Sequence, residues 1–147
     1  MEQIKCFMVE PVFDVPGSLP ASDRDWDPEF KAVLRWRNPA TGEEREWADS
    51  FGVGAMWWAT WYPRNMEWEN ETEPHLMVVT PGGHWDIDSR CSNCGKPQDK
   101  LHRCWVRHGE APNITVDKNG LTCAAGAGSI AHKTWHGYLR NGYLVQA

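Results

Sequence analysis

The chain has 147 residues, of which 41% are apolar and 24% charged, proportions typical of a globular domain and unlike those of a disordered chain. Its net charge of −5 argues against a general binder of polyanions, and no stretch approaches the roughly 18 consecutive apolar residues of a membrane span. We therefore expect a single compact domain over residues 1–147, with no membrane segment.

The two halves of the chain differ in charge and composition. Residues 1–88 carry 7 Lys and Arg against 17 Asp and Glu, a charge of −10, whereas residues 89–147 carry 8 against 3, a charge of +5. The acidic half holds most of the tryptophans, and the basic half most of the cysteines and histidines. The basic half could present a face to nucleic acid. Alternatively, the acidic half folds against the basic half, or copies of the chain meet head to tail.

The first residues predict short strands joined by turns. Residues 4–9 form an early strand that leads into a loop rich in Pro, Asp and Gly. Residues 30–36 alternate apolar and polar side chains, as a half-buried strand does. Residues 38–42 contain Asn, Pro and Gly and predict a turn, after which residues 43–47 return as the partner strand.

The middle of the chain predicts one short helix and one hairpin. Asp49 or Ser50 is a suitable N-cap for a helix that runs through residues 55–62. Residues 76–79 are a compact apolar run of the strand type. The residues that follow, 81–83, are Pro-Gly-Gly and turn the chain into a returning strand that carries Trp85 and Ile87.

The second half continues in short pieces. Residues 104–107 and 114–116 predict strands, and residues 117–120 predict a tight turn. Asn141 and Gly142 separate two apolar stretches and predict a two-residue hairpin turn. The expected fold class is therefore α+β, mostly β: a single compact domain of short antiparallel strands and hairpins with one or two short helices.

The chemistry of the second half centres on a C-x-x-C-G-K element that contains Cys91 and Cys94. Two thiolates at this spacing form a knuckle, and the glycine that follows admits the positive φ that the turn needs. A second pair, His102 and Cys104, lies eight residues on, and residues i and i+2 of a strand project from one face. We therefore predict a zinc ion, held by these four residues, that staples the C-terminal half.

Other ligands and other roles remain open for this part of the chain. Cys91 and Cys94 could instead be buried free thiols or a redox pair. A catalytic zinc would need an open coordination position and a general base. The alternative metal or active-site residues are Cys123, His108, His132 and His136. Three nearby carboxylates could act as the general base, those of Glu110, Asp86 and Asp88.

A nucleophilic site is a further alternative. It would pair Cys123 or Ser129 with His132 or His136 and a carboxylate. The segment between them is rich in Gly and Ala, but it lacks the motif of a phosphate-binding loop and the G-x-S-x-G motif. We favour a structural zinc site over either kind of catalytic site, and hence a protein that is not an enzyme.

Tryptophan is unusually frequent, with ten residues in 147. Buried indoles supply large apolar areas, and most of them must lie in the core of so small a domain. Exposed indoles anchor protein interfaces or stack on bases. We expect one or two exposed contact anchors in the closely spaced group Trp57, Trp58 and Trp61.

The stretch from Pro81 to Gly142 contains a series of distinctive motifs: PGG-x-W-x-I-D at residues 81–88, HRCWVRHG at 102–109, VDKNG-x-TC at 116–123, AGAGSI at 125–130 and HGYL at 136–139. With these motifs, the stretch resembles a family of small uncharacterised proteins encoded by phages and prophages. The resemblance implies a phage gene product that acts in the cytoplasm of the infected bacterium or is carried in the virion. It implies no particular activity. It also leaves open a ligand set of Cys94, Cys104, Cys123 and a histidine.

Three functions follow as hypotheses. The first is a phage-encoded, zinc-stabilised accessory protein that binds a host or phage macromolecule, through a protein partner or self-association, or through nucleic acid at the basic half. The second is a small hydrolase that depends on zinc or on the Cys/His residues. The third is a structural component of the virion.

Overall fold

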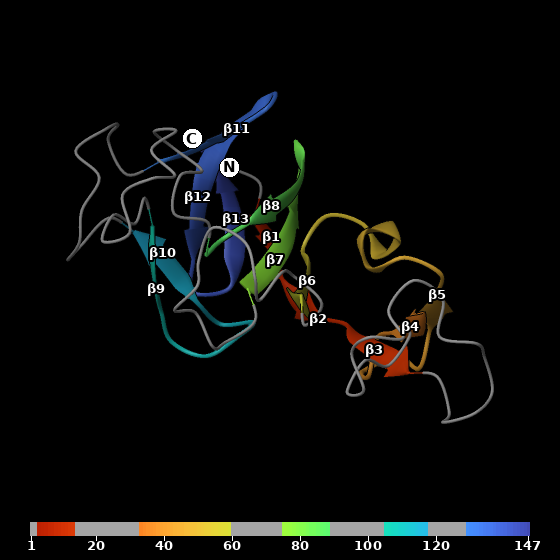
Figure 1. The fold of residues 1–147 in the computed structure, drawn as a ribbon. Coiled ribbons are helices and arrows are strands. Elements are labelled where there is room, and N and C mark those ends of the chain that lie inside the picture. The colour runs from red at the N-terminus through yellow and green to blue at the C-terminus, as the bar shows by residue number, and fades with distance from the viewer. Residues whose placement is uncertain (1–2, 14–32, 60–74, 89–104, 118–128) are drawn as a thin grey trace, which may run out of the picture.

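The computed structural model describes residues 3–13, 33–59, 75–88, 105–117 and 129–147. These residues are mostly β, as predicted, and form thirteen short strands and one 3₁₀ turn, η1 (Ala48–Phe51) (Figure 1). The strand pairs that they form are antiparallel except that of β2 (Phe7–Met8) with β6 (Ala55–Ala59), which is parallel. Among the described residues there is no helix with the length and apolar character that a membrane crossing requires.

The C-terminal sheet brings the two ends of the described chain together. Its strands, in spatial order, are β1 (Gln3–Lys5), β13 (Tyr143–Gln146), β12 (Trp135–Arg140) and β11 (Ile130–His132). The predicted hairpin at Asn141 and Gly142 is confirmed, since these two residues join β12 to β13 and both have positive φ, 49° and 78°. Glycine and asparagine tolerate this conformation, which matches the right-handed twist of the strands.

The central sheet consists of β2 (Phe7–Met8), β6 (Ala55–Ala59), β7 (His75–Thr80) and β8 (Gly83–Asp86), in that order. The predicted strand and hairpin around residues 76–87 are confirmed by β7 and β8. Every residue of β7 is buried, because both faces of this sheet are covered. A strand that is buried on both faces has a continuous apolar sequence rather than an alternating one, which explains the run at residues 76–79.

The predicted helix through residues 55–62 is wrong for the part that the structure describes. Residues 55–59 form strand β6, with all but one of them buried. Met56 packs into one core, whereas Ala55 and Trp57 pack into the core on the other side of the sheet. This two-residue alternation suits a strand between two layers, and the burial that it provides outweighs the local helix signal at Asp49 and Ser50.

Two smaller sheets flank the central one. The first contains β3 (Glu10–Phe13), β4 (Val33–Arg37) and β5 (Glu44–Arg45), and the predicted turn at residues 38–42 joins β4 to β5. The second pairs β9 (Val106–His108) with β10 (Thr115–Asp117), close to the strands predicted at 104–107 and 114–116. In Figure 1 the β3–β5 sheet and the β9–β13 strands lie on opposite sides of the central sheet.

The described residues pack into two hydrophobic cores that share the central sheet. The larger core includes a T-shaped pair between Trp85 and Trp105, whose ring centroids are 5.8 Å apart. The smaller core includes a T-shaped pair between Trp36 and Trp57 at 6.2 Å. Most of the tryptophans that the structure describes therefore fill these cores, as a small domain requires.

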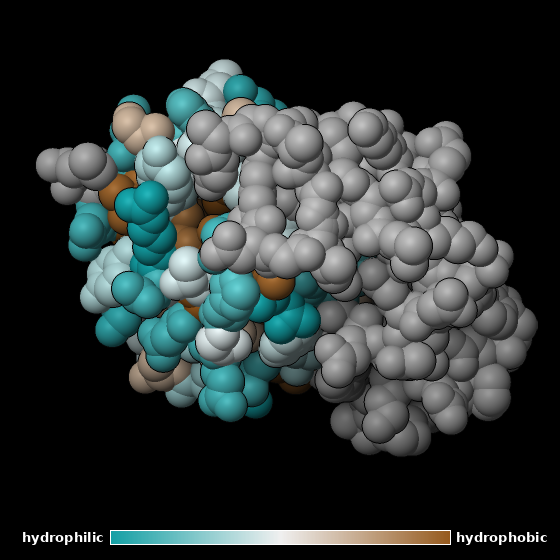
Figure 2. All heavy atoms as spheres, turned by 90° about the vertical axis from the view of Figure 1, so that its left-hand side faces the viewer, coloured by the Kyte–Doolittle hydropathy of each residue, from teal (hydrophilic) through white to brown (hydrophobic). Residues whose placement is uncertain are grey.

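The described residues at the surface on the side of β9–β13 are mostly hydrophilic (Figure 2). In Figure 2 the coloured residues of this face are predominantly polar, and hydrophobic residues show only as small separate patches. The large hydrophobic residues exposed in the described part of the chain are Trp47 and Tyr143, with 64% and 36% of their surface exposed.

Candidate functional site

The four predicted zinc ligands and Cys123 lie outside the described residues. Cys91, Cys94, His102 and Cys104 all belong to residues 89–104, so the zinc site stays a prediction. His108, His132 and His136 are described, on β9, β11 and β12. In the described ranges, no group of three or more His, Cys, Asp or Glu side chains is arranged to hold a metal ion.

Cys6 is a core residue rather than a candidate ligand. Its side chain is 2% exposed and packs in the larger hydrophobic core. Burial raises the pKa of this thiol to about 12, because an apolar environment disfavours the thiolate. The thiolate is the form that binds metal, so Cys6 behaves as a small apolar side chain.

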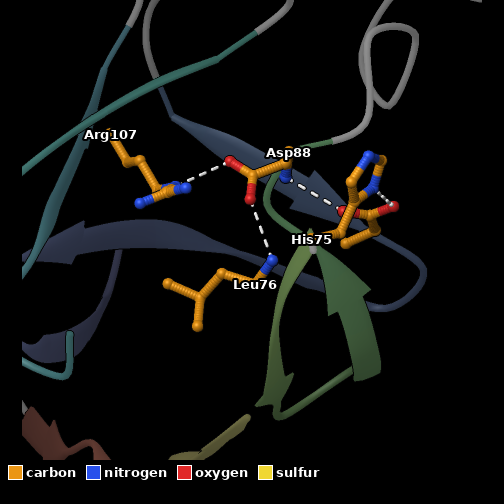
Figure 3. A network of polar contacts seen from close by, with 5 residues as sticks. His75, Leu76, Asp88 and Arg107 are labelled. Carbon is orange, nitrogen blue, oxygen red and sulfur yellow. Dashed lines mark hydrogen bonds and ion pairs between the residues drawn. The ribbon is translucent and has the colours of Figure 1, made fainter. Parts of the chain in front are cut away.

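A buried network of polar contacts lies where the cysteine-rich segment leaves and rejoins the sheets. Asp88 is its centre, with a side chain that is 9% exposed. One carboxylate oxygen accepts a hydrogen bond from the backbone N–H of Leu76, and the other accepts one from Arg107 Nε, each at 2.8 Å (Figure 3). The carboxylate is thus bonded at both oxygens, which allows a charged group to remain buried.

The network extends in two directions from Asp88. The backbone N–H of Asp88 donates to Asp86 Oδ1 at 3.0 Å, and Asp86 Oδ2 lies 2.7 Å from Nδ1 of the buried His75. On the other side, the guanidinium of Arg107 lies over the ring of Trp58, 5.0 Å from its centroid. This cation–π contact and the ion pair together hold the Arg107 side chain in one orientation.

The network connects the end of the β7–β8 hairpin with the start of β9, which are separated in the sequence by residues 89–104. Asp88 is the last described residue before residues 89–104, and Trp105 is the first one after them. The Asp88–Arg107 ion pair and the Trp85–Trp105 ring contact therefore join the two sides of this segment at its base. Sequence reasoning treated Asp86 and Asp88 only as possible general bases, whereas their carboxylates are engaged in these structural bonds.

The described histidines that were candidate ligands lie in different surroundings and do not converge on one site. His108 Nε2 lies 3.0 Å from Asp117 Oδ1. His132 Nε2 is buried and has no hydrogen-bond partner among the residues that the structure describes. Burial, and then the positive charge of Lys133, lower the pKa of His132, so its neutral form is favoured; a hydrogen bond with the His84 backbone opposes this shift.

His136 contacts the serine that the sequence named as a possible nucleophile. Ser129 Oγ lies 2.5 Å from His136 Nε2, and both side chains are accessible. They are close because β11 pairs with β12 in a register that places Ala131 opposite His136. Ser129 lies two residues before Ala131 and directly precedes β11, so it is a diagonal neighbour of His136 across this pair of strands. Of the nucleophile and base pairs considered from the sequence, this one is brought together by the structure. The pairs that use Cys123 lie outside the described residues.

The prediction of exposed tryptophan anchors is wrong for Trp57 and stays untested for Trp61. Trp57 is 5% exposed and packs in the smaller core, so it is not an exposed anchor. Trp58 is half-buried beneath Arg107, and Trp61 lies outside the described residues. In the described part of the chain, the exposed indole is that of Trp47, which the sequence analysis did not single out. The sequence feature that could have indicated its exposure is the position of Trp47 just before η1, with Glu46 and Asp49 close by in the chain.

Comparison with known proteins gave no relative: no family model, curated protein or solved structure matches this chain. The resemblance to the phage family therefore stays a prediction, and the function has to be argued from the residues themselves.

Proposed function

We propose that this chain is a phage-encoded accessory protein, stabilised by zinc, that binds a protein partner in the infected bacterium. Cys91, Cys94, His102 and Cys104 would hold the ion. The observation that carries the proposal is the anchoring of both sides of residues 89–104 by the Asp88–Arg107 ion pair and the Trp85–Trp105 contact.

Anchoring matters because it reduces the entropy that metal binding must overcome. Bringing the ends of a flexible loop together is unfavourable, and in this chain that closure is already made by the folded sheets. Zinc then has to order only the segment itself. In return, thiolate and imidazole coordination would stabilise a segment that contains Gly, Pro and few apolar residues.

Zinc content and thermal stability test this proposal. Protein purified without a chelator should hold about one zinc per chain by elemental analysis, and a strong chelator should lower its melting temperature. Cys94→Ser and Cys104→Ser should lose the zinc. Cys6→Ala is the matched control: it removes a thiol from the core and should retain one zinc, even if it is less stable. Absence of zinc in the wild-type protein, or its retention in both serine variants, would contradict the proposed site.

The place of action can be tested in the same system. An accessory protein of the cytoplasm should be absent from purified virions, whereas a structural component should be present there in fixed proportion. Quantitative mass spectrometry of particles and of infected-cell lysates separates these two roles.

Acyl hydrolysis is the second candidate function, and the Ser129–His136 contact favours it. With Nε2 unprotonated, His136 would accept the hydroxyl proton while Ser129 Oγ attacks the carbonyl carbon of an ester. The bond between that carbon and the leaving oxygen then breaks, and Nε2 passes the proton to the leaving group. A water molecule, activated by His136 in the same way, would release the acid and restore Ser129.

Labelling with a fluorophosphonate probe tests this second candidate. The wild-type protein should be modified at Ser129, and Ser129→Ala and His136→Ala should abolish the modification. Ser50→Ala is the control, because Ser50 is an exposed serine whose hydroxyl donates a hydrogen bond to the Trp47 carbonyl oxygen and not to a histidine. If labelling of Ser129 proceeds equally without His136, or does not occur in the wild-type protein, the contact is structural only.

A further inference from the structure

Trp47 is the most exposed large hydrophobic side chain in the part of the chain that the structure describes. Its exposed fraction of 64% contrasts with 3–6% for the buried indoles of Trp36, Trp57, Trp85, Trp105 and Trp135. Exposing an indole forgoes the large stabilisation that its burial gives. An indole left outside both cores is therefore available for contact with another molecule.

The backbone that carries Trp47 is held firmly. The Trp47 carbonyl oxygen accepts hydrogen bonds from Ser50 N at 3.1 Å and from Ser50 Oγ at 2.6 Å. Arg45 Nη1 donates to the Ser50 carbonyl oxygen at 3.0 Å, and the Arg45 guanidinium lies over the ring of Phe51. A side chain presented on an ordered backbone loses less entropy on binding than one on a flexible loop.

The charges around Trp47 favour a cationic partner. The three arginines of the neighbouring β3–β5 sheet are each paired with a glutamate: Arg35 with Glu44, Arg37 with Glu10, and Arg45 with Glu43. The carboxylates on either side of Trp47 in the chain, those of Glu46 and Asp49, have no Lys or Arg partner among the described residues. Asp49 lies 3.9 Å from the exposed His84, a contact that is ionic only when that ring is protonated.

An exposed indole that is flanked in the chain by two carboxylates, those of Glu46 and Asp49, is suited to a Lys or Arg side chain. The face of the indole attracts a cation, and the carboxylates add Coulomb attraction. The same charges repel the phosphates of nucleic acid. The basic residues 89–147 of a second copy are a possible source of such side chains, but their net charge of +5 is spread over 59 residues. A short basic segment concentrates its charge and fits one exposed ring better.

We propose that Trp47, with Glu46 and Asp49, is the anchor through which this protein binds an exposed Lys/Arg-rich segment of a protein partner. The inference rests on the binding role proposed above and names the chemistry of the partner. Binding through Trp47 does not require zinc, so an experiment can contradict the zinc site without contradicting the Trp47 anchor, and the reverse.

Fluorescence anisotropy with a labelled nonapeptide of alternating Arg and Gly tests this anchor on the full-length protein. We expect saturable binding that weakens with added salt, about a tenfold loss of affinity in Trp47→Ala, and a smaller loss in Trp47→Phe. A double variant, Glu46→Gln with Asp49→Asn, should weaken binding several-fold. Tyr143→Ala, which removes the other exposed aromatic ring, should leave affinity unchanged.

Three outcomes would overturn the proposal. These are no saturable binding of the peptide by the wild-type protein, equal affinity in Trp47→Ala and wild type, and equal binding of a nonapeptide in which Glu replaces Arg. Sedimentation velocity of the free protein provides a further test: a wild-type dimer that dissociates in Trp47→Ala would assign the anchor to a second copy instead. Zinc content and melting temperature, measured on the same samples, show whether a failure concerns Trp47 or the metal site.

Discussion

Replacement of Asp88 by alanine is expected to lower the free energy of unfolding by about 3 kcal/mol. The substitution leaves the buried N–H of Leu76 without its acceptor and Arg107 without its counter-ion. Loss of one partner of a buried ion pair typically costs roughly 3–5 kcal/mol, and the lower end applies because the Arg107 side chain is 26% exposed. For a chain of this length, the melting temperature should fall by about 6–12 °C.

The matched control is Glu10→Gln. Glu10 Oε1 lies 2.7 Å from Arg37 Nη2, as short a contact as that of Asp88, but both side chains are more than 40% exposed. An exposed ion pair contributes about 0–1 kcal/mol, since water solvates the charges when the pair is broken. Urea denaturation followed by tryptophan fluorescence gives both values. Equal losses in the two variants would show that burial does not strengthen the Asp88 network.

Replacement of Gly137 by alanine should destabilise the C-terminal sheet by about 3 kcal/mol. Gly137 is buried in β12 between its partners Ile130 and Gln146. A Cβ atom at this position would overlap the ring of Trp135, two residues earlier in the same strand, and the carbonyl oxygen of Val145 in the next strand. Neither can move freely, because Trp135 is buried in the core and the carbonyl belongs to the sheet backbone.

Gly42→Ala separates steric overlap from backbone strain. Gly42 has a φ of 78°, which disfavours alanine, but a Cβ there would meet no atom within 4 Å. Its cost should therefore be about 1 kcal/mol, from the left-handed conformation alone. Thermal and urea denaturation of the two variants should rank Gly137→Ala well below Gly42→Ala in stability. A Gly137→Ala protein as stable as wild type would mean that Trp135 can leave its place over the strand.

The predictable parts of this fold are those with local causes. The hairpins at Asn141-Gly142 and at residues 81–83 were identified because particular residues tolerate the conformations of tight turns. The apolar run of β7 was identified because a doubly buried strand needs apolar side chains on both faces. Residues 55–59 were assigned to a helix because the local sequence contains an N-cap, but no residue in that window shows that a core will cover each side.

The candidate site was predictable only in part. The residue types suggested pairing Cys123 or Ser129 with His132 or His136, and the β11–β12 register brings Ser129 and His136 together. Nothing in the sequence indicated that Asp88 would bond to Arg107, 19 residues away, or to the backbone of Leu76. Likewise, Trp57 and Trp47 have the same side chain, and only packing determines that the first fills a core and the second is exposed.

The sequence by itself determined that this chain is mostly β, where several of its turns lie, and which half carries the cysteines, histidines and positive charge. The tertiary structure alone decided which carboxylates are buried in ion pairs and which tryptophan remains exposed. The physical reason is range: turn and strand preferences act over a few neighbouring residues, whereas burial and ion pairing depend on residues that the fold brings together from distant positions.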